Sequence, residues 1–417
     1  MPWRSCSIHL RREPMAVTRR SLAYGLTANV VVLGVVSLFT DISSEMIMPI
    51  LPFFLIQVLG ANALIVGIQE GLADGVVSFM KVFSGRFSDA AGKRKRFVGA
   101  GYALSTLMKA LFPFAQSWPE FLGMRIVERT GKGVRDAPRD ALLTESTPAE
   151  TRGKAFGFHR SMDTTGAIAG PIITLVLLAT IAASPGIPNY RLILLLAAIP
   201  AVISVFIVFL VSEPVRQRAP KQPLRVTFHG IPKPLWTFIG IASIFSFADF
   251  SYAFLLLRAG IHGTTVAILL YVVYNIVYAA HAFPAGILSD RVGRKPVVLT
   301  GYIAFIAMAT LLVFSDLLAV LVLAFVLYGL SYGMAEGTQR ALVADFAPAN
   351  IKATVLGAYH TCVGAVKLAS GVVAGLLWIA FAPTPTFPLG AATFAFGAMA
   401  ATVAAIGLSL WKAPVRS

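Results

Sequence analysis

Two stretches of sequence, GRFSDAAGKRKR beginning at Gly85 and GILSDRVGRK beginning at Gly286, decide the fold of this 417-residue chain. Each has a glycine, an aspartate four residues later, a second glycine three residues after that, and then basic residues. The pair Gly-Tyr, at Gly101 and Gly301, recurs with the same displacement of about two hundred residues. Several matches in register indicate an internal duplication.

The composition places both copies in a membrane. Apolar residues make up 57% of the chain and charged residues only 13%, whereas about a quarter of a soluble protein is charged. Apolar stretches near twenty residues recur, which is the length a helix needs to cross a bilayer. We predict an all-α integral membrane protein with twelve transmembrane helices in two pseudo-symmetric six-helix bundles. The predicted spans are 24–57, 62–85, 97–117, 119–143, 155–182, 190–212, 236–257, 263–287, 296–315, 318–343, 353–380 and 388–411.

A Pro-rich, basic stretch without apolar periodicity separates the two copies. The predicted organisation is a cytoplasmic N-terminal segment 1–23, a six-helix bundle 24–212, a cytoplasmic linker 213–235, a second bundle 236–411 and a cytoplasmic tail 412–417.

The formal net charge of +16 comes from Lys and Arg concentrated in alternate connections, with Arg191 and Arg258 as the main exceptions. By the positive-inside rule, both termini and the basic loops lie in the cytoplasm. The charge therefore indicates orientation and lipid contact, not nucleic-acid binding. We expect a multi-pass, monomeric protein of the cell's inner (cytoplasmic) membrane. Its expected partners are the bilayer, a small solute and protons, and no cofactor is implied.

The paired loops resemble the signature loop of the major facilitator superfamily, Gly-x-x-x-Asp-x-x-Gly-[Arg/Lys]-[Arg/Lys]. The resemblance, with twelve spans and a central linker, covers nearly the whole chain. It implies secondary transport by alternating access, in which these loops latch the cytoplasmic side of an outward-open state. The gating residues that it implies are Gly85, Asp89, Gly92, Arg94, Gly286, Asp290, Gly293 and Arg294.

Span 5 contains Gly166-Ala-Ile-Ala-Gly170-Pro171. The two glycines allow close helix packing and the proline bends the helix. The element resembles the Gly-x-x-x-Gly-Pro motif of the family's exporters, although the usual following Gly-Gly is replaced by Ile172-Ile173. It favours export over import.

Charged residues inside the predicted spans are the candidates for chemistry, because a charge in the bilayer normally faces a bundle interior or a cavity. The candidates for proton coupling or substrate contact are Asp41, Glu45, Asp74, Arg125, Glu128, Arg129, Asp163, Asp249 and Glu336. A carboxylate in low dielectric can load and release a proton near neutral pH. One hypothesis is that Asp41 or Glu45, with Glu128 or Asp163, takes a coupling proton. The alternative is that Arg125 and Arg129 neutralise Glu128 and the acids of span 1 in fixed ion pairs.

Oxygen, nitrogen and sulfur donors also lie near one another in spans 1 and 5, and such a mixture suits a divalent transition metal. The metal candidates are Glu45, Met46, Met48, His159, Met162 and Asp163. The segments SLFTDISSEMIMPILPFFL, GKGVRDAPRDALLTEST and RGKAFGFHRSMDTTGAIAGP resemble a bacterial and archaeal group of the superfamily that includes nickel-resistance exporters and magnetosome permeases. Tyrosines at helical spacing in the second half could stack on an organic solute or simply pack: Tyr271, Tyr274, Tyr278, Tyr328 and Tyr332.

Other classes fit less well. Gly131-Lys132-Gly133 fails the P-loop pattern, so transport must run on a gradient. No paired catalytic motif accompanies His159, Arg160 and Asp163, so an enzyme is not expected. The leading interpretation is proton-coupled export of a divalent metal or a drug-like organic compound. The alternative is an importer of a metabolite or a metal chelate.

Overall fold

The fold is described from a computed structural model of the 417-residue chain. The structure describes residues 26–148, 151–181, 187–213, 230–348, 351–384 and 386–412. The predicted N-terminal segment, most of the predicted linker and most of the predicted tail lie outside the described residues.

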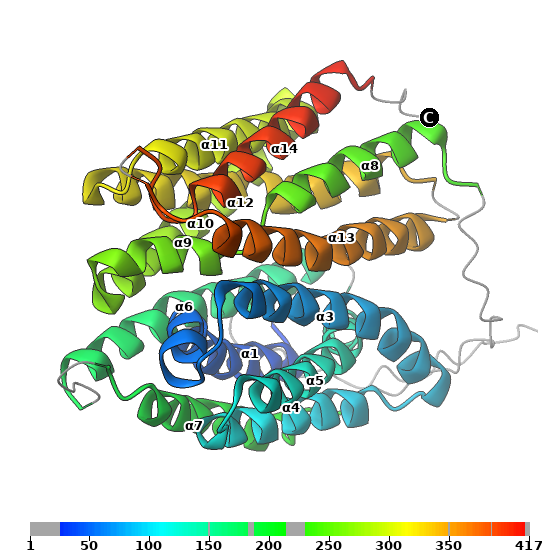
Figure 1. The fold of residues 1–417 in the computed structure, drawn as a ribbon. Coiled ribbons are helices and arrows are strands. Elements are labelled where there is room, and N and C mark those ends of the chain that lie inside the picture. The colour runs from blue at the N-terminus through cyan, green and yellow to red at the C-terminus, as the bar shows by residue number, and fades with distance from the viewer. Residues whose placement is uncertain are drawn as a thin grey trace, which may run out of the picture.

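Long helices make up both halves of the described chain (Figure 1). The first half consists of α1 (Ala28–Ile47), α2 (Leu51–Phe53) continued by a π-turn (Phe54–Val58), α3 (Ala63–Ala91), α4 (Arg94–Leu111) with a 3₁₀ turn (Phe112–Phe114), α5 (Trp118–Glu145), α6 (Arg152–Ala179) and α7 (Tyr190–Val208). The second half consists of α8 (Lys233–Ala248), α9 (Tyr252–Ala259) with a 3₁₀ turn (Gly260–His262), α10 (Thr264–Val292), α11 (Arg294–Phe314), α12 (Leu318–Phe346), α13 (Lys352–Ala380) and α14 (Ala391–Leu410).

Eleven helical spans of the described chain are long and apolar enough to cross a membrane, with α8, α9 and their 3₁₀ turn forming one of them. The twelfth span, α5, is too rich in charge for that criterion. It packs against both α3 and α4, and its charged residues Arg125, Glu128 and Arg129 are buried. Because these charges face protein and not lipid, the span is compatible with a bilayer. The predicted all-α fold with twelve membrane spans is confirmed.

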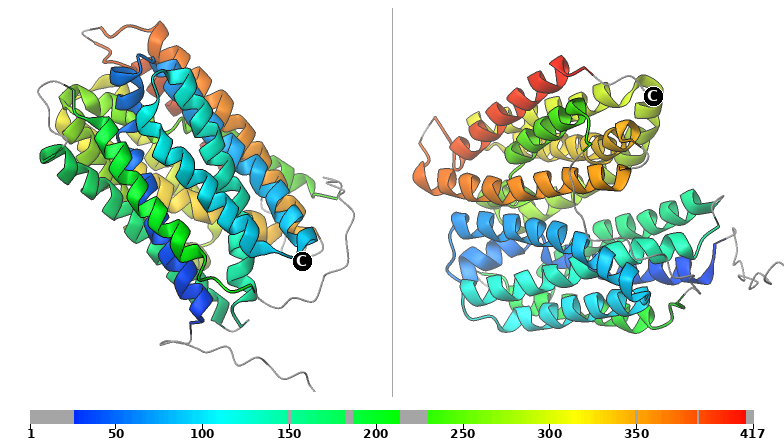
Figure 2. Two further views of the ribbon diagram at one scale, coloured as in Figure 1. Left: turned by 90° about the horizontal axis from the view of Figure 1, so that it is seen from below. Right: turned by 90° about the vertical axis from the view of Figure 1, so that its right-hand side faces the viewer.

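The two halves pack as separate bundles that meet along two helix pairs, α3 with α13 and α6 with α10 (Figures 1 and 2). At the first pair, a Cβ added to Gly67 would lie 2.0 Å from the carbonyl oxygen of Gly371, and one added to Gly371 would lie 2.1 Å from that of Gly67. Only glycine allows such a backbone contact, as in small-residue packing between membrane helices. Gly71 and Gly375 continue this glycine seam against Leu368 and Leu64.

The bundles are close at one end of the molecule and apart at the other. We call the end that carries Gly92 and Gly293 the loop face and the opposite end the far face. The helices α3 and α13 lie together at the far face and diverge toward Ala91 and Lys352 at the loop face (Figure 1). At the far face the hydroxyl groups of Tyr190 and Thr264 also join the halves at 3.1 Å. The backbones of α3 and α13 therefore lie closer together at the far face than at the loop face.

Two predicted spans are interrupted where the sequence analysis expects continuous helices. Span 1 ends as α1 at Ile47 and resumes at Leu51. Pro49 has no N–H for the helical ladder, which accounts for the interruption. The span predicted over 236–257 starts earlier, at Lys233, and breaks between Ala248 and Tyr252.

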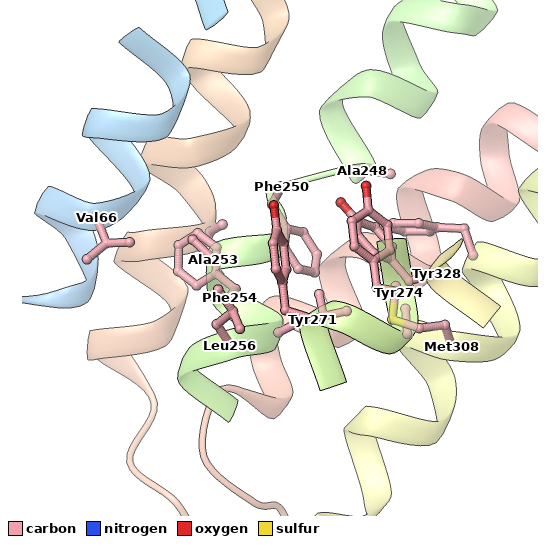
Figure 3. Packing of buried hydrophobic residues seen from close by; sticks show 14 of the residues in the cluster. Val66, Ala248, Phe250, Ala253, Phe254, Leu256, Tyr271, Tyr274, Met308 and Tyr328 are labelled. Carbon is pink, nitrogen blue, oxygen red and sulfur yellow. The ribbon is translucent and has the colours of Figure 1, made fainter. Parts of the chain in front are cut away.

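The break between α8 and α9 contains no proline or glycine. Ser251 adopts φ 75°, and its hydroxyl accepts a hydrogen bond from the N–H of Ala253, so it caps α9. Phe250 turns into the core, where it packs against Phe254 (Figure 3). It also contacts the ring of Phe394. Asp249 ends α8. The break thus leaves a carboxylate and a hydroxyl beside the interface between the halves.

Candidate functional site

The two signature loops have matching contacts. Arg94 Nη2 lies 2.7 Å from Asp89 and 3.1 Å from Glu145, which ends α5. Arg294 lies 2.7 Å from Asp290 through Nη2 and 3.1 Å from Asp345 through Nε. Each loop arginine therefore links the end of one helix to the helix two spans later within its own half.

The loop glycines have the backbone conformation that the sequence pattern predicts. Gly92 has φ 62° and Gly293 has φ 97°, values that side-chain-bearing residues rarely adopt. The following lysines extend the repeat, because Lys95 Nζ donates to Phe209 O and Lys295 Nζ to Ser409 O, both at 2.8 Å. The packing around the first glycine of each loop is less close. A Cβ added to Gly85 would lie 3.4 Å from Ala137, and one added to Gly286 would meet nothing within 4 Å. Close packing is therefore not the role of Gly286 in this state.

The Gly-x-x-x-Gly-Pro element packs directly on the acidic residues of α1. A Cβ added to Gly166 would lie 2.8 Å from the Cβ of Asp41, and one added to Gly170 would lie 2.7 Å from the Cβ of Glu45. Pro171, inside α6, is buried next to Gly170. The element predicted for helix packing thus fixes the segment of α1 that carries the candidate proton carriers.

Glu45 and Asp163 have neutral or weakly basic partners. Tyr271 of α10 donates its phenolic hydrogen to Glu45 Oε2 at 2.9 Å, across the interface between the halves. Ser37 donates to Asp163, whose other oxygen lies 3.5 Å from His159 Nδ1. In the described chain no Arg or Lys forms an ion pair with Glu45 or Asp163. The fixed-ion-pair alternative therefore does not describe Glu45.

Glu128 is different, because it is held between two arginines. Its Oε2 lies 3.1 Å from Arg125 Nη1 and 3.4 Å from Arg129 Nε, and all three side chains are at most 6% exposed. Lys109 lies in the same interior and donates to Ser43 and Ser44 at 3.2 and 2.8 Å. A buried carboxylate with two guanidinium partners is strongly held in its ionised form. For Glu128 the structure favours the fixed ion pair.

Both arginines also reach the break in span 1. Arg125 Nη2 lies 3.4 Å and Arg129 Nη2 3.6 Å from the sulfur of Met48. Tyr252, the first residue of α9, donates to the same sulfur at 2.9 Å. Glu70 of α3 accepts from Ser251 at 3.1 Å and from Tyr252 at 3.5 Å. The interruptions of spans 1 and 7 therefore meet at one polar cluster.

A second link between the halves is centred on Lys367 of α13. Its Nζ lies 3.4 Å from Asp74 of the first half and 3.5 Å from Asp249 of the second. Tyr328 donates to Asp249 at 3.1 Å. Asp249 and Lys367 line a pocket of about 140 Å³ formed by α8, α11, α12 and α13, which is also lined by Tyr332, Glu336 and His360.

Glu336 lies toward the loop face of this pocket. Arg340 Nη2 is 3.0 Å from its Oε1, and Tyr278 donates to its Oε2 at 3.1 Å. Arg160 of the first half donates to the Tyr278 hydroxyl group. The predicted tyrosines form a connected series of ring contacts, including Tyr271 with Tyr274 at 5.6 Å and Tyr274 with Tyr278 at 6.3 Å between centroids.

Of the metal candidates, His159 and Asp163 lie 3.5 Å apart, but the others have separate partners. Met46 lies in the hydrophobic core at 3% exposure, Met48 accepts from three donors, and Glu45 is bonded to Tyr271. A Cβ on Gly34 would meet Met162 at 3.2 Å, which places Met162 in the α1–α6 contact. Among the described residues no group of three or more His, Cys, Asp or Glu could hold a metal ion.

Sequence reasoning did not find Tyr252, Lys109 or the role of Glu70. Arg191 and Arg258, the exceptions to the charge pattern, have structural roles. Arg191 donates to the carbonyl of Pro113, and the fully buried Arg258 donates to Leu312 O at 3.2 Å and Ser315 O at 3.1 Å. Both arginines thus satisfy carbonyl groups at the far-face ends of α4 and α11, where a cation is favoured.

Comparison with known proteins agrees with this architecture. The sequence profile of the Major Facilitator Superfamily matches residues 33–367. An uncharacterized MFS-type transporter of Methanocaldococcus jannaschii is 38% identical over 373 residues, which are 88% of this chain and 92% of that protein. The chain belongs to the major facilitator superfamily. It is therefore a membrane transporter with an alternating-access fold, and not an enzyme.

More distant similarities are local or limited to the fold. The multidrug resistance protein MdtH of Photorhabdus laumondii is 30% identical over 128 residues, 30% of this chain and 31% of that protein. The nucleoside transporter NupG superposes with a TM-score of 0.73 at 12% identity, covering 93% of this chain and 100% of NupG. A D-xylose-proton symporter superposes with a TM-score of 0.69 at 14% identity, covering 93% of this chain and 97% of the symporter.

Proposed function

We propose that this transporter exports a small solute in exchange for protons. The observation that carries the proposal is the contact of the exporter-type glycines with the acidic residues of α1. Gly166 and Gly170 hold α6 against Asp41 and Glu45 so closely that a Cβ would lie within 2.8 Å of either side chain. Protonation of Glu45 weakens its role as the acceptor of the Tyr271 bond between the halves, so a proton can change the balance between states.

The proposal keeps the orientation that the charge pattern predicts. In this proposal the loop face lies on the cytoplasmic side of the inner membrane, both termini are cytoplasmic, and the protein acts as a monomer. The signature loops at Asp89 and Asp290 latch this face when the cavity opens outward. The solute is an organic compound or a divalent metal. The tyrosine series favours the organic compound, and the dispersed metal candidates do not favour the metal.

The local similarity to a protein named for multidrug resistance supports export. Deleting the gene in its host and scoring growth against panels of organic toxicants and metals tests the direction. Loss of resistance to members of one panel is expected. Unchanged resistance across both panels, or reduced growth on a nutrient, would instead favour an importer of a metabolite or a metal chelate.

Proton coupling is tested separately in proteoliposomes that contain a pH-sensitive dye. With a solute identified by the growth panels, addition on the loop-face side is expected to cause proton movement in the opposite direction. A matched vesicle containing the Glu45→Gln variant serves as the control. Solute transport without any proton movement in wild-type vesicles would contradict the coupling.

A further inference from the structure

Three hydrogen-bond donors converge on one weak acceptor where the two interrupted spans meet. Arg125 Nη2 at 3.4 Å, Arg129 Nη2 at 3.6 Å and the Tyr252 hydroxyl at 2.9 Å all point to the thioether of Met48. Methionine sulfur is only a weak acceptor. The bonds of the two guanidinium groups to this sulfur are therefore weak, and the other acceptor of the phenol, Glu70, lies 3.5 Å away.

The remaining partners of the arginines do not remove this deficit. One carboxylate, Glu128, is shared by both guanidinium groups at 3.1 and 3.4 Å. Within the described part of the chain, the buried Nε of Arg129 makes no hydrogen bond. The Gln69 amide, turned so that its oxygen faces Arg125 Nε at 3.2 Å, supplies one further acceptor. Buried donors normally find full partners, and here two guanidinium groups share one carboxylate and one thioether, so a stronger acceptor at the position of the sulfur would improve their bonding.

The site is positioned to receive a solute. Arg125 and Arg129 are 3% and 5% exposed, whereas Met48 and Tyr252 are half-buried. The arginines come from α5 in the first half, and Tyr252 comes from the start of α9 in the second. An acceptor that displaces the sulfur would therefore contact both halves at once, as a transported solute must in alternating access.

We propose that Arg125, Arg129 and Tyr252 bind the anionic group of the transported solute in place of the Met48 sulfur. A carboxylate suits the two guanidinium groups, because charge-assisted hydrogen bonds to such an anion are shorter and stronger than those to a neutral acceptor. The inference names the solute class within the organic branch of the proposed function. It rests on transport of a solute but not on the direction of transport or on proton coupling.

The surroundings define the rest of the solute. The ring of Tyr252 lies 5.2 Å from that of Tyr271, and Tyr271 lies 5.6 Å from Tyr274. From the donor cluster, a flat apolar body can pack along these rings toward the loop face. Glu70, bonded to Ser251 and Tyr252, repels a second negative charge. The structure thus favours a monoanion with an aromatic or similarly flat body.

Equilibrium binding to the purified full-length protein tests this inference with three probes that share a ring: benzoate, benzyl alcohol and benzylamine. Benzoate is expected to raise the apparent melting temperature in a dose-dependent way, and the neutral and cationic analogues are not. The binding assay uses no gradient, so benzoate binding can be found even if the protein is not a proton-coupled exporter. Conversely, export can be found even if benzoate does not bind. Equal stabilisation by benzylamine, or none by benzoate up to millimolar concentration, would overturn the proposal.

Variants assign the binding to these donors. Arg129→Gln is expected to weaken benzoate binding at least tenfold, whereas Arg152→Gln, at an exposed arginine on the loop face, keeps wild-type affinity. If Arg129→Gln does not fold, Tyr252→Phe carries the test, with a severalfold loss expected. Its control is Tyr302→Phe, which removes a buried hydroxyl group that has no partner among the described residues. Unchanged affinity in Arg129→Gln or, in its place, Tyr252→Phe would refute the assignment.

Discussion

The hydroxyl group of Tyr271 donates to the carboxylate of Glu45 at 2.9 Å, and the two residues belong to opposite halves of the transporter. This bond lies beside the α1–α6 contact, where Gly170 meets Glu45. A change in the charge of Glu45 therefore acts on a bond between the halves, at a point of α1 that α6 holds closely in place.

The first prediction concerns proton coupling at this position. Glu45→Gln and Asp41→Asn are expected to retain downhill exchange of solute but to lose accumulation driven by a pH gradient, because neither amide can carry the coupling proton. Transport into proteoliposomes with and without a pH gradient measures the difference. Full gradient-driven transport in both single variants and in the double variant would exclude these two carboxylates.

A second prediction concerns the latch at the loop face. Asp290→Asn is expected to lower the transport rate severalfold, since an exposed pair such as Asp290 with Arg294 at 2.7 Å contributes about 0.2–1 kcal/mol and the loop is proposed to latch the outward-open state. Solute affinity measured without a gradient is expected to change much less. Asp89→Asn tests the equivalent loop of the first half. A loss of affinity as large as the loss of rate would show that these residues act in binding.

A third prediction follows from the charges at Lys367. Lys367→Gln leaves Asp74 and Asp249 without the cation that lies 3.4 and 3.5 Å from them, and it is expected to lower the melting temperature. Adding Asp249→Asn to this variant is expected to restore part of the loss, because the less exposed of the two carboxylates is then neutral. Strictly additive destabilisation in the double variant would show that the contact has no energetic role.

A fourth prediction concerns the packing between the halves. Gly67→Val is expected to destabilise the protein by about 1–3 kcal/mol, as overpacking of an interior does, because a Cβ would lie 2.0 Å from a backbone oxygen. Gly240→Val in α8, where a Cβ would meet nothing within 4 Å, is the matched control. Thermal unfolding in detergent measures both. Similar melting temperatures in the two variants would contradict the close approach.

The repeat and the membrane fold could be predicted from the sequence because their signals are local. The loop glycines need φ above zero. Arg94 and Arg294 are close enough in sequence to Asp89 and Asp290 to pair with them. Hydrophobicity likewise marked the spans. Hydrophobicity alone does not identify α5 as a membrane span. Its buried ion pairs give this helix the polar composition of a helix in a soluble protein.

Contacts between distant segments could not be predicted in this way. The meeting of Met48 with Tyr252 depends on two interruptions, of which only the first has a proline as its signal. The break before Tyr252 depends on Ser251 as a helix cap and on Phe250 turning into the core, and both require the packed structure. Nor does an isolated Lys367 in the sequence indicate which of several carboxylates it will contact.

The glycine seam between α3 and α13 also bears on the speed of the transport cycle. Where large side chains interlock, one helix can move past another only after several rotamers change together, and each change raises the activation barrier. Gly67 and Gly371 present bare backbone to one another, so the helices can roll in contact with few such rearrangements. The glycine seam can therefore keep the activation barrier for this helix movement low. Bulky residues there would slow the exchange of states even when both states still form.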